Sequence, residues 1–89
     1  MDEITTWNVA IDIGEHDGRT RAVAHLDPRD GRRLAGVGFA RLAPTDRDVP
    51  EIGAEIAVAR ALADLSRRLL SVATEDVEHV TGEPSHLVM

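Results

Sequence analysis

The sequence predicts a small α+β domain in the order β-β-β-α-α: a three-stranded antiparallel sheet, one long helix and a short C-terminal helix. Three observations predict this fold. Apolar and polar residues alternate in the N-terminal half, glycine-containing turns separate the alternating segments, and apolar residues recur at helical spacing in the C-terminal half. A chain of 89 residues has room for one core. We assign residues 1–82 to that domain and residues 83–89 to a flexible tail.

The first predicted strand has the clearest alternation. Its apolar residues are Trp7, Val9, Ile11 and Ile13, and small or polar residues separate them. This period of two is typical of a strand with one buried face. Residues 14–18 begin and end with glycine and therefore predict a hairpin connection.

The second and third strands are predicted at residues 19–26 and 34–42. One side of the second strand is small and apolar, and the other side is basic. Between the two strands, residues 27–31 contain a proline and a glycine in the order of a tight turn. In the third strand, Gly36 and Gly38 share a face. Glycine weakens a strand unless another backbone approaches closely, so we expect the helix to pack tightly there.

The long helix is predicted from about Val49 to about Val72, and Asp48 and Glu51 form a capping box at its start. Two apolar stripes run along it. We expect the first stripe to cover the sheet; it consists of Ile52, Ile56, Ala59, Ala63, Ser66 and Leu70. The second has the spacing of a helix–helix seam and consists of Val58, Leu62, Leu65, Leu69 and Val72. Because one sheet needs only one stripe, the second stripe predicts a homodimer interface.

A second, short helix is predicted after the long one. Thr74 is placed as its N-cap, Glu75 and Asp76 lie in its first turn, and Gly82 marks its end.

The composition limits the cellular compartment of the protein and the kinds of ligand and nucleophile that it can supply. The chain has no cysteine, which fits a reducing compartment and excludes cysteine ligands and nucleophiles. The N-terminus lacks a basic segment followed by an apolar run, and no apolar stretch approaches the ~20 residues of a membrane span. We therefore expect a cytoplasmic protein without a membrane partner.

No motif for catalysis, a metal or a cofactor is found. The segment 36–41 lacks the last glycine of a phosphate-binding loop, and no helix opens directly after it. Glu15, His16 and Asp17 are adjacent on a predicted turn, where they rarely converge on one metal. We expect a non-enzymatic protein with no catalytic residue, no metal site, no cofactor and no small-molecule substrate.

The net charge of −6 conceals a basic segment. Residues 19–41 hold six arginines and two aspartates, a local charge of +4. Strand alternation places basic residues and one aromatic on one sheet face, which are ingredients for phosphate contact and base stacking. The candidate RNA-binding residues are Arg19, Arg21, Arg33, Phe39 and Arg41. A solvated face, a face buried in an assembly, and an adaptor module with no nucleic-acid role are the alternatives.

The chain also resembles a known family over nearly its whole length. The residues that carry the resemblance are Trp7, Thr20–Ala22, Gly36–Leu42, Pro44–Asp46, Val49–Gly53 and Ala57–Leu62. It looks like a family of small actinobacterial proteins of unknown function that includes mycobacterial dormancy-associated proteins. The resemblance implies a fold similar to double-stranded-RNA-binding domains and to ribosome hibernation-promoting factors. It further implies a β-β-β-α order, a homodimer, and ribosome binding during stress.

Overall fold

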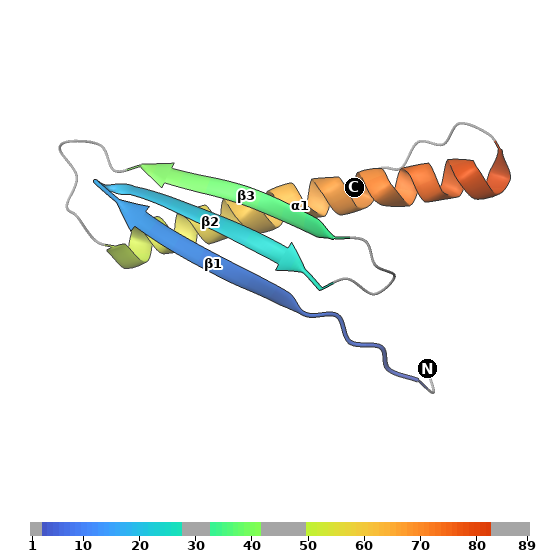
Figure 1. The fold of residues 1–89 in the computed structure, drawn as a ribbon, viewed down its shortest axis with the longest axis horizontal. Helices are drawn as coiled ribbons and strands as arrows, with labels where there is room; N and C mark the ends of the chain where they lie inside the picture. The colour runs from blue at the N-terminus through green and yellow to red at the C-terminus, as the bar shows by residue number, and fades with distance from the viewer. Residues whose placement is uncertain (1–2, 28–32, 42–49, 83–89) are drawn as a thin grey trace.

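The computed structural model describes residues 3–27, 33–41 and 50–82. Three antiparallel strands form one sheet in the order β1-β2-β3, and a single long helix packs on one face (Figure 1). The elements are β1 (Val9–His16), β2 (Arg19–Leu26), β3 (Leu34–Arg41) and α1 (Pro50–Thr81). The predicted α+β class and the order of three strands before a long helix are confirmed.

The first hairpin is tighter than predicted. Strand β1 continues through His16, so its connection to β2 is only Asp17 and Gly18. Both residues have positive φ, 50° and 70°. This is the backbone of a type I′ turn, whose twist matches that of the flanking strands and for which Asp-Gly is a preferred sequence.

The core lies between α1 and the β2–β3 half of the sheet. Ala22 and Ala24 are fully buried, and the register places them directly opposite Gly38 and Gly36 on β3. Directly opposed residues share a face of the sheet. The core is completed from the same strands and from the helix by Ala40, Ala57, Ala61 and Leu65.

The two glycines of β3 allow the helix to approach closely, as predicted. A Cβ at Gly36 would collide with the backbone of Ala61 and Leu65, and one at Gly38 with the backbone of Ala57 and Ala61. Any side chain at either glycine would therefore push the helix away from the sheet.

The prediction of which helix stripe covers the sheet was wrong. Ile52 and Ile56 of the first stripe are 49% and 40% exposed, and Ala59, Ala63 and Ser66 are also exposed. The residues that face the sheet are Gly53, Ala57, Ala61 and Leu65. Small side chains face the sheet because the contact with the glycines of β3 is close. The larger isoleucines of the first stripe therefore lie on the opposite side of the helix.

The predicted second helix does not exist as a separate element. Helix α1 is continuous to Thr81, and Thr74 lies inside it. The Thr74 hydroxyl donates to the carbonyl of Leu70 at 2.9 Å, so it bonds back into the helix and caps nothing. No glycine or proline lies between Val72 and Thr74, and nothing in the sequence interrupts the helix there. It ends before Gly82, whose φ is positive (71°).

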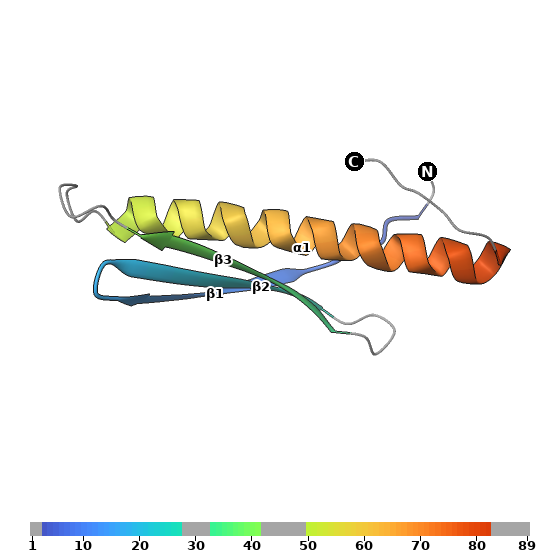
Figure 2. The same cartoon turned by 90° about the horizontal axis from the view of Figure 1, so that it is seen from above.

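The apolar residues of β1 are not buried in this chain, contrary to the prediction. Val9, Ile11 and Ile13 pair with Leu26, Ala24 and Ala22, which places them on the same sheet face as the helix. All three are exposed, because α1 lies over β2 and β3 and scarcely reaches β1. The side view shows the helix and sheet as two layers, with α1 extending beyond the sheet (Figure 2).

Several predicted features lie outside the described residues. They are Asp48 in the capping box, most of the turn at residues 27–31, the end of the third strand at Leu42, and the tail at residues 83–89. Across the described ranges, α1 lacks the long uncharged segment that a membrane-crossing helix requires.

Candidate nucleic-acid interface

The face of the sheet that points away from α1, called here the outer face, carries the candidate residues. Alternation along β2 and β3 places small buried residues toward the helix and the other residues outward. The outer-face residues of these two strands are Arg19, Arg21, Val23, His25, Ala35, Val37, Phe39 and Arg41. No other element covers this face among the described residues.

Four of the five candidate residues are brought together by the strand register. Arg19 lies directly opposite Arg41, and Arg21 lies directly opposite Phe39. These cross-strand pairs are neighbours on one face, so the three arginines lie next to an aromatic ring that is 59% exposed. Among the described residues, no ion pair neutralises these three arginines. We call Arg19, Arg21, Phe39 and Arg41 the arginine cluster.

Arg33 does not join the arginine cluster. It precedes β3, whereas Arg41 ends that strand. Eight residues of extended chain separate the two arginines by about 26 Å. Arg33 and Arg41 have the same parity and therefore share a face of the sheet, but they lie at opposite ends of it.

An open hollow of about 910 Å³ lies beside the arginine cluster. Its lining combines arginine side chains with apolar surface and includes Asp12, Glu15, His16, Arg19, Arg21, Val23, His25 and Phe39. The hollow therefore places two arginines and two carboxylates, Asp12 and Glu15, around an aromatic ring and an aliphatic side chain. Such a surface can contact phosphates and the flat face of a base at the same time.

One border of the hollow holds a histidine–carboxylate pair. The Nε2 atom of His25 on β2 and the Oδ2 atom of Asp12 on β1 lie 3.1 Å apart. This contact joins two neighbouring strands and gives the carboxylate of Asp12 a partner on β2. Consequently, the acid in this part of the hollow has a partner of its own and does not pair with the arginine cluster.

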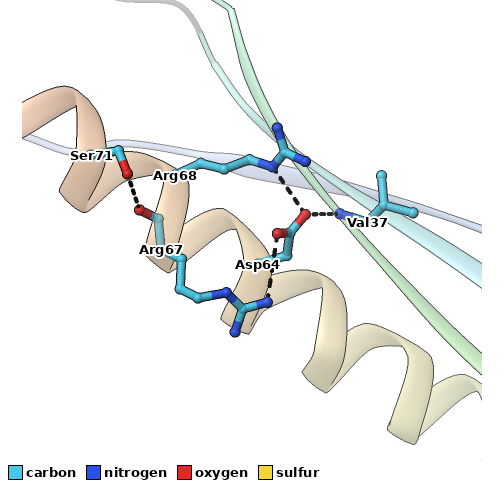
Figure 3. Close-up of polar contacts among 5 residues, drawn as sticks. All are labelled: Val37, Asp64, Arg67, Arg68 and Ser71. Atoms are coloured by element: carbon cyan, nitrogen blue, oxygen red, sulfur yellow. Dashed lines mark hydrogen bonds and ion pairs between the residues drawn. The ribbon is translucent and has the colours of Figure 1, made fainter.

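A second polar cluster joins α1 to β3, and its main contact was not predicted. Within the helix, Asp64 pairs with Arg67 and Arg68, three and four residues further on, at 3.6 and 3.0 Å. In addition, the backbone N–H of Val37 donates to Oδ2 of Asp64 at 2.9 Å (Figure 3). The hydrogen bond from Val37, with help from Arg68, holds the pKa of Asp64 below its usual range. Asp64 therefore fastens the helix to the sheet.

The five residues predicted as a dimer interface differ in exposure. Leu65 is only 6% exposed and belongs to the core, and Val58 packs against that core. Leu69 and Val72 are half-buried, whereas Leu62 is 41% exposed. Among the five residues of the second stripe, Leu62 therefore has the largest exposed fraction.

The described residues contain no group of three histidine, aspartate or glutamate side chains placed to hold a metal ion. Glu15, His16 and Asp17 lie at the β1–β2 hairpin, where His16 and Asp17 make one exposed contact of 3.2 Å.

Comparison with known proteins identifies the relatives of this chain. The Rv2632c-like family model matches residues 5–86. The uncharacterized protein Mb1767 of Mycobacterium bovis is 56% identical over 82 residues, which cover 92% of this chain and 86% of the relative. The uncharacterized protein Rv2632c of Mycobacterium tuberculosis is 47% identical, covering 89% and 84%. A crystal structure of Rv2632c is similar with a TM-score of 0.83 and 44% identity, covering 94% of this chain and all of that one.

Proposed function

This chain belongs to the Rv2632c-like family, and we propose that it acts without catalysis, by binding single-stranded RNA through the outer face of its sheet. The arginine cluster carries the proposal. Three arginines without ion-pair partners among the described residues lie next to an exposed aromatic ring, on the face of the sheet that α1 does not cover. Guanidinium groups bind phosphates in a planar, bidentate manner, and aromatic rings stack on bases.

The acidic net charge limits the binding mode. With −6 overall, the chain has no general attraction to polyanions. Contact with RNA must then be local, where residues 19–41 are basic, and must rely on stacking by Phe39 as well as on charge. We therefore expect a preference for single strands, whose bases can be reached, over duplexes.

Ribosomal RNA during stress or dormancy is the target that the sequence resemblance suggests, and it is part of the same proposal. If the proposal is right, the protein cosediments with ribosomes at low salt in extracts of starved or hypoxic cells and is released at high salt. Its absence from ribosomal fractions at low salt would exclude ribosome binding. Binding to other RNA would then be decided by the direct test with purified components.

The direct test uses purified protein and a fluorescently labelled single-stranded oligonucleotide. Anisotropy should rise on binding, and the double variant Arg21→Glu, Arg41→Glu should abolish the rise. Arg33→Glu is the control, because it reverses a charge of the same type about 26 Å away along the same strand. Equal loss of binding in the control and the double variant, or no binding by the unaltered protein, would contradict the proposal.

A protein-binding module without a nucleic-acid role is the second candidate. The observation that favours it is the apolar part of the outer face, where Val23 lies opposite Val37 and Phe39 is exposed. Salt separates the two candidates, since phosphate binding weakens steeply as salt rises and apolar contact does not.

A further inference from the structure

A carboxylate lies in the hollow of the outer face, beside the arginine cluster. Asp12 of β1 lies directly opposite Val23 of β2, and both residues line the hollow. Directly opposed residues share a face of the sheet, so Asp12 belongs to the outer face. A negative charge at this place repels phosphate, and it favours only a ligand that also brings a hydrogen-bond donor. Asp12 therefore limits which polyanion the hollow accepts.

His25 orients the carboxylate of Asp12. The Nε2 atom of His25 lies 3.1 Å from Oδ2 of Asp12, and a carboxylate only accepts hydrogen bonds, so the imidazole N–H is the donor. Among the described residues, Oδ1 of Asp12 has no hydrogen-bond partner, and the Asp12 side chain is 81% exposed. Oδ1 is thus an oriented acceptor that a ligand can reach.

Open space lies between this acceptor and the arginine cluster. Gly14 is directly opposite Arg21, and a Cβ at Gly14 would meet nothing within 4 Å. Asp12 comes two residues earlier on β1 and is the diagonal neighbour of Arg21 on the same face, about 7–8 Å away. The space at Gly14 is therefore bordered by a carboxylate and by a guanidinium group.

We propose that Asp12, oriented by His25, accepts a hydrogen bond from a ribose 2′-hydroxyl and thereby makes the outer face selective for RNA over DNA. This inference rests on the RNA binding proposed above. In RNA, the 2′-hydroxyl is on the carbon next to the one that bears the 3′ phosphate. An acceptor and a cation that border the same space can therefore bind both groups of one nucleotide. DNA has the phosphate and lacks the donor.

The strand register gives each part of the RNA a place. The phosphate binds Arg21, and the ribose whose 3′ oxygen carries that phosphate lies over Gly14, within reach of Asp12. Phe39 is directly opposite Arg21 on the other side, and the base of the next nucleotide stacks on its ring. Sugar, phosphate and base thus follow one another across β1, β2 and β3.

A ribose suits this acceptor better than a base or a cationic partner does. Stacking on an aromatic ring tolerates any base, because every base has a π-face. A base donor at Asp12 would require one particular base there, whereas every ribonucleotide carries the 2′-hydroxyl. The three neighbouring arginines repel a cationic partner.

Three oligonucleotides test the proposal with the unaltered protein. They are an oligouridylate, its deoxyribose counterpart and its 2′-O-methyl counterpart, all of one length and with the same fluorescent label. Anisotropy titrations at one salt concentration should show that the RNA binds about tenfold more tightly than the DNA, as one hydrogen bond to a charged group predicts. The 2′-O-methyl strand keeps the sugar shape of RNA but has no donor, so it should bind as weakly as the DNA.

Substitutions then locate the acceptor. Asp12→Ala should reduce the ratio of RNA affinity to DNA affinity to about one, partly by strengthening DNA binding, because it also removes a negative charge. Asp17→Asn is the matched control: it removes a carboxylate that does not line the hollow, and asparagine tolerates the positive φ of 50° at this position. This control should change both affinities by the same factor and keep their ratio.

His25 is a positioning residue in this account. His25→Ala should lower the ratio of the two affinities, and His25→Gln, which keeps an N–H donor, should restore part of it. A purely structural role of His25 would change both affinities alike.

Equal binding of RNA and DNA by the unaltered protein would overturn the inference and leave the proposed RNA binding intact. Binding of the 2′-O-methyl strand as tightly as RNA would also overturn it, since sugar shape would then be the feature that is read. If none of the three strands binds, the proposed function itself is contradicted, and the inference falls with it.

Discussion

The carboxylate of Asp64 on α1 accepts a hydrogen bond from the backbone N–H of Val37 on β3, at 2.9 Å. Because β3 is an edge strand, a second strand could otherwise pair with this N–H. On the same edge, the Nη1 atom of Arg60 donates a hydrogen bond to the carbonyl oxygen of Phe39, which is then also not free to pair with another strand. The helix thus protects one edge of the sheet with side chains. The other edge is β1, whose apolar residues Val9, Ile11 and Ile13 are exposed.

The contact of Asp64 predicts how stability depends on pH. Its pKa is lower in the folded chain than in the unfolded one, so ionised Asp64 favours the folded state. This contribution is present above the ordinary carboxyl pKa and is lost as pH falls through the lowered value. Asp64→Asn should therefore lower the urea midpoint near neutral pH, and the difference from the unaltered protein should shrink in acid below about pH 4.

Glu55→Gln is the control for Asp64, because it removes the same charge from an exposed position on the same helix. It should move the neutral urea midpoint little. If the two variants lose equal stability at neutral pH, net charge would explain the effect and the contact with Val37 would not.

The close approach of helix and sheet predicts that Gly38→Ala is strongly destabilising. The added Cβ would overlap the helix backbone at Ala57 and Ala61, and that backbone cannot rotate away as a side chain could. We expect a loss of about 2 kcal/mol or more in the free energy of unfolding. Gly14→Ala is the matched control, since a Cβ there meets nothing within 4 Å. Chemical denaturation of both variants measures the difference; similar stability would refute the close packing.

The continuity of α1 predicts the effect of two changes at Thr74. Thr74→Ala should keep or slightly raise helix content, because alanine has the higher helix propensity and the hydroxyl caps nothing. Thr74→Pro should disrupt the helix, at a cost of about 3 kcal/mol for an interior position. Far-ultraviolet circular dichroism measures both. If alanine destabilises by the ~1 kcal/mol of a lost N-cap and proline is tolerated, a second helix starts at Thr74 after all.

The arginine cluster predicts a definite salt dependence of RNA binding. Three phosphate contacts to single-stranded RNA give a slope of about −2 for log K against log salt concentration. Replacing Arg21 with alanine should reduce the slope by about 0.7, the share of one phosphate. Replacing Arg33 should leave it unchanged. Anisotropy titrations at several salt concentrations give these slopes, and a slope near zero would point to apolar binding instead.

The sequence was a reliable guide wherever a local rule decides the structure. Strict alternation predicted the strands, the two glycines that bracket residues 14–18 predicted a hairpin, and the glycines of β3 predicted a close helix contact. Alternation along each strand also placed the arginine cluster on one face, since Arg19 and Arg21 alternate on β2 and Phe39 and Arg41 alternate on β3. Arg33 has the same parity but lies at the other end of β3, because parity gives the face of a residue and not its position along the strand.

The errors concern how the elements pack. Hydrophobicity suggested that the isoleucine stripe covers the sheet. The helix backbone lies so close to Gly36 and Gly38, however, that only small residues such as Ala57 and Ala61 fit between helix and sheet. The hydrogen bond from Val37 to Asp64 joins positions 27 residues apart, and no local sequence pattern predicts it. Similarly, Thr74 has the composition of a cap, but the helix passes through it because nothing before it breaks the helix.

The most direct test of the RNA-binding proposal is to map the contact by nuclear magnetic resonance. Single-stranded RNA is titrated into the ¹⁵N-labelled protein, and backbone amide shifts are followed. The account predicts shifts concentrated at Arg19, Arg21, Phe39 and Arg41 on the outer face, with α1 and Arg33 unaffected. Shifts confined to α1 or to the exposed residues of β1, or no shifts at low salt, would contradict it.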